Sequence, residues 1–154
     1  MPTTLDTFRS PYRLLVVANE ALDTDAAPAR DVVDLHHRTG LEVLVVAPAS
    51  AGWLERWTSD DRPRRTAEAR LRRCLGELRA EGVQAEGLVG DGDLLLAIED
   101  ALRLFDADEV VVAVAPGRQS GELASDLAEQ VRARCAWRVR NLVVGVAACG
   151  AIAA

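Results

Sequence analysis

The stretch that decides the fold is Val83–Pro116, VQAEGLVGDGDLLLAIEDALRLFDADEVVVAVAP. A short alternating run over Val83–Val89 leads into the turn Gly90-Asp91-Gly92-Asp93, and apolar residues then recur at helical spacing from Leu94 to Phe105. The unbroken apolar run Val110–Ala115 is typical of a strand covered on both faces, as in a parallel sheet with crossover helices. The stretch therefore predicts one β-α-β unit.

The same two patterns continue on both sides of this unit. They predict three more strands, at Tyr12–Ala18, Leu41–Ala47 and Arg138–Ala147, and three more helices, from about Pro28 to Arg38, at Arg62–Gly82 and at Gly121–Arg134. Strands that alternate with helices predict an α/β fold: a doubly wound parallel sheet with helices on both faces. The apolar stripe of the long helix is expected to be Ala67, Leu71, Cys74, Leu75 and Leu78.

Length and composition favour a single domain. The chain has 154 residues, of which 49% are hydrophobic and 27% charged, as in a globular protein. Residues 1–10 are predicted to be a loose leader and residues 11–154 one α/β domain. No apolar run is long enough to span a bilayer, and the N-terminus has no apolar signal-peptide core. We therefore expect a cytoplasmic protein without a membrane partner.

Charge and residue usage exclude several classes of function. The net charge of −6 argues against general nucleic-acid binding, because a polyanion would be repelled. All 18 basic residues are arginine, which excludes chemistry that needs a lysine amine, such as a Schiff base. The three cysteines, Cys74, Cys135 and Cys149, form no metal-binding pattern and are expected to be reduced, packed thiols.

An ordered set of segments resembles the universal stress protein family. These segments are the opening strand LLVVAN, the stretch GDGDLLLAIEDALRLFDADEVVVAV, and the last helix and strand SDLAEQVRARCAWRVRNLVV. The resemblance runs from Tyr12 to Val146. It implies five parallel strands in the order 3-2-1-4-5, and dimerisation through the last strand.

The sequence departs from this family at its nucleotide-binding positions. Members that bind ATP carry G-x2-G-x9-G-[ST] after the fourth strand and an adenine-contacting Asp after the first. Here Gly117 matches the first glycine, and Ser120 takes the place of the second. Ala124-Ser125 replaces the final Gly-Ser, and the loop before it is too short. Asn19 replaces the adenine-contacting Asp. The chain is thus expected to be a divergent member without an intact ATP-binding motif.

Ligands of open α/β sheets bind where the strand order reverses, at the carboxyl ends of the first and fourth strands. The candidate contacts there are Asn19, Gly117, Arg118, Ser120 and Ser125, and Arg118 is suited to bind a phosphate. The other interpretation is that these are turn residues beside a solvated arginine. No cofactor is expected under that interpretation, whereas ATP or AMP is the alternative.

Three other features have a functional and a structural interpretation each. Asp91 and Asp93 resemble a metal-binding pair, but helix capping is the favoured explanation and no metal site is predicted. The final segment, residues 141–154, is apolar and predicts a homodimer through an exposed edge strand. Arginines crowd one helix and suggest either a solvated face or a surface for an acidic partner: Arg62, Arg64, Arg65, Arg70, Arg72 and Arg73.

Two functions from different classes remain open. The first is a universal stress protein-like regulatory module that is dimeric, non-catalytic, and binds ATP weakly or not at all. The second is a protein that binds, or binds and hydrolyses, an adenine nucleotide such as ATP through a reshaped loop over residues 116–125. No spacing in the sequence indicates a nucleophile or catalytic triad, so no catalytic residue is predicted.

Overall fold

A computed structural model describes residues 11–18, 40–49, 61–114, 120–135 and 141–146. The leader over residues 1–10 and the helix expected between Pro28 and Arg38 lie outside these ranges. All statements below concern the described residues.

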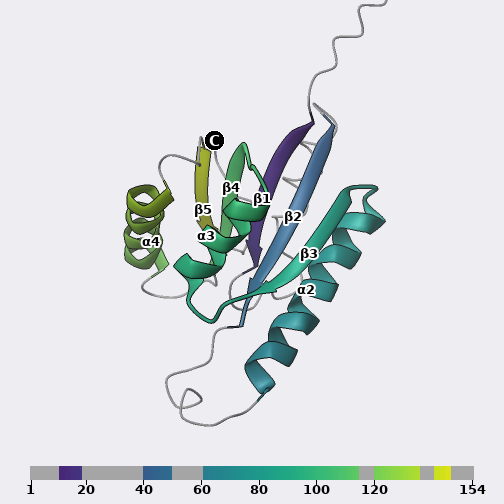
Figure 1. Ribbon diagram of the computed structural model, residues 1–154, viewed down its shortest axis with the longest axis horizontal. Coiled ribbons are helices and arrows are strands. Elements are labelled where there is room, and N and C mark those ends of the chain that lie inside the picture. The colour runs from purple at the N-terminus through teal and green to yellow at the C-terminus, as the bar shows by residue number, and fades with distance from the viewer. Residues whose placement is uncertain (1–10, 19–39, 50–60, 115–119, 136–140, 147–154) are drawn as a thin grey trace, which may run out of the picture.

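The described chain is an α/β sheet with helices, as the sequence predicts (Figure 1). Five strands are hydrogen-bonded in the order β3-β2-β1-β4-β5, and every neighbouring pair is parallel. The strands are β1 (Tyr12–Ala18), β2 (Leu41–Pro48), β3 (Gln84–Gly90), β4 (Glu109–Val114) and β5 (Asn141–Val146). The helices are α2 (Arg62–Ala80), α3 (Leu94–Leu104) and α4 (Ser120–Cys135).

The expected limits of β3 and α2 need correction. Val83 does not belong to the strand, because its N–H donates to the carbonyl of Leu78 and closes the end of α2. Gly82 has φ +80° and its N–H donates to the carbonyl of Arg79. These two bonds form a Schellman motif, in which a glycine in the left-handed region ends the helix. Glycine is required at position 82 because an L side chain rarely adopts that conformation.

Two apolar layers enclose the sheet, one on each face. The first joins alternate residues of β1 and β2, such as Val16 and Val45, to the buried stripe Ala67, Leu71, Cys74 and Leu78 of α2. The second joins the intervening residues, such as Val17 and Val46, to α3 and to Val131 of α4. Side chains alternate between the faces of a strand, so β1 and β2 serve both layers and are buried along most of their length.

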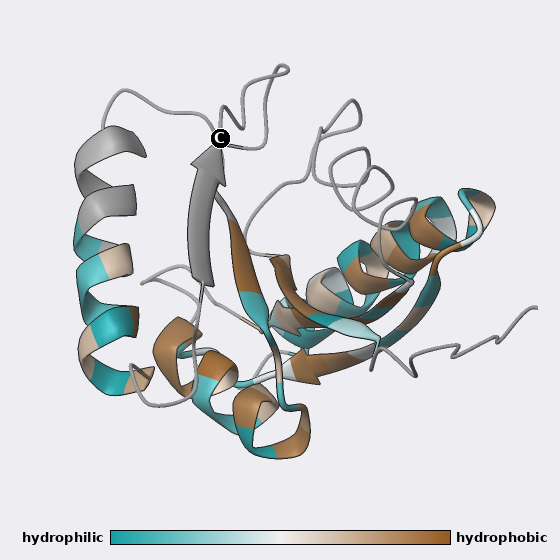
Figure 2. Ribbon diagram, turned by 90° about the horizontal axis from the view of Figure 1, so that it is seen from above, coloured by the Kyte–Doolittle hydropathy of each residue, from teal (hydrophilic) through white to brown (hydrophobic). Residues whose placement is uncertain are grey.

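The helices therefore lie on opposite faces: α2 on one, α3 and α4 on the other (Figures 1 and 2). In Figure 2 the hydrophobic colour is prominent on the coloured strands and on α3, while the coloured turns of α4 are mostly hydrophilic with lighter patches. None of the helices in the described ranges is long and apolar enough to cross a membrane.

Candidate functional site

The carboxyl ends of the strands form the edge at which a ligand is expected. Ala18, the last residue of β1, pairs with Ala113 of β4, so the segments that follow these two strands begin at adjacent points. The chain runs from β1 to β2 on one side and later enters β4 on the other, which makes this point the switch in strand order.

Three of the five predicted ligand contacts lie outside the described residues: Asn19, Gly117 and Arg118. Ser120 is the first residue of α4 and Ser125 lies further along the same helix, but only their backbone is described. The grouping of these five residues into one site remains a prediction.

The start of α4 bears directly on nucleotide binding. β4 ends at Val114 and α4 begins at Ser120, so only residues 115–119 connect them. A loop of the form G-x2-G-x9-G-[ST] that starts at Gly117 would still be open well beyond residue 120. Here residues 120–125 are already helical, and their backbone N–H groups beyond the first turn are used within the helix. The described backbone does not fit a triphosphate loop of that kind.

Arg70 is a residue at this edge that the sequence analysis placed elsewhere. Its Nη1 donates to the carbonyl of Ala18 at 3.1 Å and lies 3.5 Å from the carbonyl of Pro48. The guanidinium group of Arg70, which lies on α2, thus contacts backbone carbonyl groups at the ends of both β1 and β2. Arg70 follows Ala67 by three residues and precedes Cys74 by four, a spacing that could have placed it beside the buried stripe.

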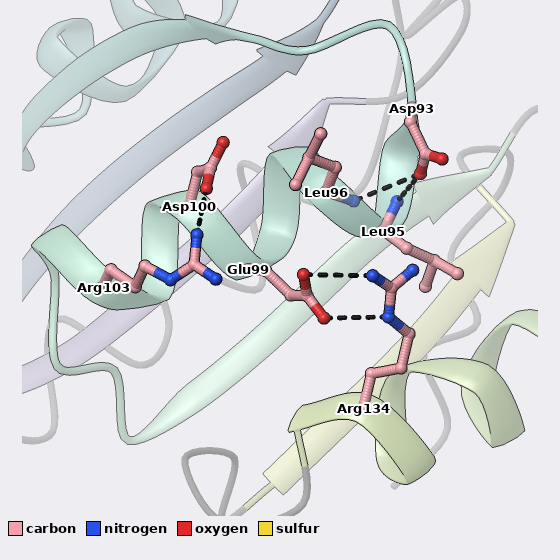
Figure 3. A network of polar contacts seen from close by, with 7 residues as sticks. All are labelled: Asp93, Leu95, Leu96, Glu99, Asp100, Arg103 and Arg134. Carbon is pink, nitrogen blue, oxygen red and sulfur yellow. Dashed lines mark hydrogen bonds and ion pairs between the residues drawn. The ribbon is translucent and has the colours of Figure 1, made fainter.

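The turn between β3 and α3 is held by its own carboxylates. Asp93 Oδ1 accepts hydrogen bonds from the N–H groups of Leu95, at 2.9 Å, and Leu96, at 3.2 Å (Figure 3). Asp91 Oδ1 accepts one from the N–H of Asp93 at 2.8 Å. These contacts make Asp93 the N-cap of α3, as the capping interpretation predicts. Among the described residues, no group of three or more metal-binding side chains occurs.

Close packing explains the glycines of this turn. A Cβ on Gly90 would lie 2.8 Å from the Cβ of Ala97 and 2.9 Å from Cγ2 of Val46, and one on Gly92 would lie 3.0 Å from the carbonyl oxygen of Ala49. The N–H of Ala49 also donates to the carbonyl of Gly90 at 3.1 Å. The glycines therefore allow α3 and the end of β2 to approach the turn.

The two described cysteines are poor nucleophiles. Cys74 and Cys135 are both free and buried. Burial, with a smaller contribution from the charge of Glu77, raises the pKa of Cys74 to about 11. Burial likewise raises the pKa of Cys135, with a contribution from Glu99. The charge of Arg134 acts to lower the pKa of Cys135, but burial outweighs it, so neither thiol has the lowered pKa of a reactive cysteine. Cys149 lies outside the described residues.

The arginines of α2 do not form a single uniform surface. Arg70 is turned to the strand ends, Arg64 pairs with Glu68 at 3.4 Å, and Arg73 pairs with Glu77 at 3.5 Å. Arg65 and Arg72 are exposed, and Arg62 makes a further contact. The predicted surface of six arginines therefore has fewer available charges than expected. One of the six, Arg70, contacts strand ends, and two others form ion pairs along the helix.

Solved structures of the same fold are found among universal stress proteins. The universal stress protein from Archaeoglobus fulgidus in complex with dAMP superposes with a TM-score of 0.60 at 20% sequence identity, covering 86% of this chain and 97% of that one. A second structure of a universal stress protein from Archaeoglobus fulgidus superposes with a TM-score of 0.60 at 18% identity, covering 86% and 92%.

No protein-family model matches the sequence, and neither does any curated protein. The structural similarity extends over most of both chains, and it agrees with the strand order and the helix placement described above. At this level of identity the similarity concerns the fold. The chain has the fold of the universal stress proteins.

Proposed function

We propose that the protein is a universal stress protein-like regulatory module that is non-catalytic, dimeric, and binds adenine nucleotides weakly or not at all. The observation that carries this proposal is the short connection between β4 and α4. Because α4 starts at Ser120, only residues 115–119 and the free N–H groups in the first turn of α4 are available to contact a triphosphate. The G-x2-G-x9-G-[ST] loop of the ATP-binding members is considerably longer than this connection.

Isothermal titration calorimetry with ATP and AMP tests the nucleotide part of this proposal. We expect no dissociation constant below about 100 μM, because the connection offers few free amides. The matched variants are Arg118→Ala, in the predicted ligand loop, and Arg132→Ala, an exposed arginine in the last turn of α4. Micromolar ATP binding that Arg118→Ala abolishes and Arg132→Ala preserves would overturn the proposal.

That outcome would favour the second candidate, an adenine-nucleotide-binding protein that uses residues 116–125. One observation supports this candidate: the A. fulgidus protein of the same fold has been solved in complex with dAMP. A monophosphate needs fewer N–H donors than a triphosphate, so AMP is the discriminating ligand. Asn19, Gly117, Arg118, Ser120 and Ser125 are the proposed contacts, and loss of AMP binding in Asn19→Ala would support them.

The proposed dimer uses residues 141–154. Among the described strands, β5 is the last of the sheet and pairs with β4 on one side only, and its sequence NLVVGV carries no charge. An uncharged edge strand exposes backbone N–H and C=O groups that a second copy can pair with. Light scattering coupled to size exclusion is expected to give a dimer for the full chain and a monomer, or insoluble protein, for a chain truncated after Asn141. A full chain that stays monomeric at high concentration contradicts the proposal.

We also propose a surface for an acidic partner on α2, to be tested at Arg64, which is paired with Glu68, and at the exposed Arg65. Exchange of both for glutamine is expected to abolish salt-sensitive capture of an acidic peptide, because screening weakens exposed charge pairs. Capture that is unchanged by the exchange, or by salt, would eliminate this surface.

A further inference from the structure

A second candidate site lies at the opposite edge of the sheet, where the strands begin. The register places residues in rows across β1, β2 and β3. Arg13 pairs with Glu42 and Glu42 with Gln84, and in the next row Leu15, Leu44 and Glu86 stand side by side. All of them belong to the face that α3 covers, since Leu15 and Leu44 pack in the α3 layer. The amino ends of this face are therefore polar, and its centre is apolar.

The end of α3 leaves these first rows uncovered. The helix stops at Leu104, and a cleft of about 320 Å³ opens between its last residues and the start of β2 and β3. Leu104 and Phe105 form one wall, and Glu42, Leu44, Gln84 and Glu86 line the sheet side. Leu104 is 76% exposed, the most exposed large apolar residue among those described. The size of this cleft is at the lower end of small-molecule sites.

Arg13 lines the cleft too, but it is already engaged. Its guanidinium lies over the ring of Phe105, 4.3 Å from the ring centre, and its Nε forms an ion pair with Glu42 Oε2 at 3.3 Å without the geometry of a hydrogen bond. The charge of one cation is thus shared between a ring face and a carboxylate. Within the described chain, Glu86 forms no ion pair and no side-chain hydrogen bond, and it is exposed to the cleft. The lining carries one negative charge more than positive charge.

The helix end adds to this field. The C-terminal turn of α3, which supplies Leu104 and Phe105, bears the partial negative charge of the unpaired carbonyls. Arg103 in the same turn does not neutralise the cleft, because it pairs with Asp100 at 2.6 Å (Figure 3). Glu86, Glu42 and the end of α3 therefore all favour a positive charge between them, beside apolar contact from Leu44 and Leu104.

We propose that this cleft binds a small organic monocation, an ammonium or guanidinium carried on an apolar body. The cationic head lies against Glu86 and the free oxygen of Glu42, and the body lies against Leu44 and Leu104. The site is at the amino ends of the strands, on the opposite edge from the nucleotide position, and it does not depend on the function proposed above.

Calorimetry and amide chemical-shift mapping with the full-length protein test this proposal. The probes are 2-phenylethylammonium and its neutral counterpart of similar shape, 2-phenylethanol. We expect the cation to bind with a dissociation constant of about 1 mM or tighter, a normal affinity for a ligand of this size. Shifts should concentrate on the start of β2 and β3 and on the end of α3. The neutral probe should bind at least about threefold more weakly, because it lacks the charge-assisted hydrogen bond.

Matched variants separate this site from nonspecific attraction to an acidic protein. Glu86→Gln preserves the shape of the side chain and is expected to weaken the cation about three- to tenfold, as for a partly exposed charged hydrogen bond. Glu129→Gln removes a carboxylate from α4 that is likewise exposed, and it should leave affinity unchanged. Equal effects of the two variants, equal binding of the two probes, or no shifts in the cleft at about 10 mM cation would each overturn the proposal.

Discussion

The carboxylate of Asp93 accepts two backbone hydrogen bonds, and Asp91 accepts the backbone N–H of Asp93. At the scale of single residues, these contacts explain why two acidic side chains stand close together. The first N–H groups of a helix have no partner within the helix, and a carboxylate there also interacts favourably with the helix dipole. The pair serves the local fold, and no divalent ion is needed to account for it.

Replacement of Asp93 tests this assignment. Asp93→Ala is expected to lower the free energy of unfolding by about 1 kcal/mol, the usual cost of losing an N-cap. Asp93→Asn should restore most of the loss, because its side-chain oxygen accepts the same bonds. Urea unfolding followed by circular dichroism measures both. A rise in melting temperature of the native protein on adding Mg²⁺ or Ca²⁺, absent in Asp93→Asn, would contradict the capping role.

The buried thiol of Cys74 predicts a dependence of stability on alkaline pH. Its pKa is raised to about 11 in the folded protein, above that of an exposed thiol near 8.5–9. The contribution is fully present below about pH 8.5 and is lost as pH rises toward 11, because only the unfolded chain ionises readily in that window. Unfolding free energies measured from pH 8 to pH 11 should fall more steeply for the native protein than for Cys74→Ala, by up to about 2 kcal/mol. Parallel curves would show that this thiol does not couple folding to pH.

At the scale of elements, the turn between β3 and α3 depends on the absence of side chains. Ala97 and Val46 approach Gly90 from α3 and β2, so the helix rests on the strand end with little room between them. α2 contains a glycine of the opposite kind, Gly76, which is exposed and has open space where a Cβ would stand. The two positions form a matched pair for substitution.

Gly90→Ala is expected to destabilise the fold by about 1–3 kcal/mol, because the new methyl group overlaps packed atoms. Gly76→Ala is expected to stabilise it by about 0.5–1 kcal/mol, because alanine restricts the unfolded chain and favours the helix. Thermal and urea unfolding of both variants provide the measurement. Equal effects would mean that the close approach at Gly90 has no energetic consequence.

An ion pair connects α3 to α4. Arg134 Nε lies 2.8 Å from Glu99 Oε1, and its Nη2 donates to Oε2 at 3.1 Å, so the pair is bidentate (Figure 3). The side chain of Glu99 is 19% exposed and that of Arg134 is 45% exposed, which lets solvent screen the attraction. The ion pair therefore fixes the relative orientation of α3 and α4 but contributes little to the free energy of unfolding.

A double-mutant cycle with Glu99→Gln and Arg134→Gln measures this interaction. We expect a coupling free energy of about 0.5–1 kcal/mol in low salt, because the pair is bidentate yet partly exposed. The coupling should decrease in 1 M NaCl, where charges are screened over about 3 Å. A coupling above about 2 kcal/mol that salt does not change would indicate a desolvated pair.

At the scale of the whole molecule, β1 and β2 unite two apolar layers into one cooperative structure. Val45 faces the α2 layer and is fully buried, whereas Ile98 is fully buried in the α3 layer on the other side of the sheet. Neither layer is complete without the shared strands. Because the sheet separates them, changes in one layer should affect the other only through the common unfolding transition.

Val45→Ala and Ile98→Val test this arrangement. The first should cost about 1–3 kcal/mol and the second about 0.5–1.5 kcal/mol, from lost burial and the cavities that remain. The double variant should lose the sum to within about 0.5 kcal/mol, since the two side chains share no packing partner. Circular dichroism and tryptophan fluorescence should report the same midpoint. Separate midpoints would show that the two layers unfold independently.

Most elements could be predicted because their signals are local. β1 matches its predicted bounds, and the buried stripe of α2 contains four of the residues expected, with Leu75 partly buried beside them. The errors arose at boundaries: Val83 looks like a strand residue but closes α2 by a backbone hydrogen bond to Leu78. Apolarity alone does not reveal which backbone bond a residue makes.

The residues of the candidate sites could be predicted less completely than the elements of the fold. Asn19, Gly117 and Arg118 follow from sequence position and a family resemblance, and they remain predictions. Arg70 was counted with the charged face of α2, whereas its guanidinium contacts carbonyl groups at the ends of β1 and β2. Its partners lie 52 and 22 residues away in the chain, so no local pattern indicates them.

The sequence by itself determined the class of fold, the order of its elements along the chain and the N-cap of α3. These features depend on the spacing of apolar residues and on hydrogen bonds between near neighbours. Only the tertiary structure decided what meets at the edges of the sheet: the contact of Arg70 with two strand ends, and the cleft between Glu86 and Leu104. The physical reason is that strand order and register bring together side chains from separate segments, and neither is encoded in any one segment.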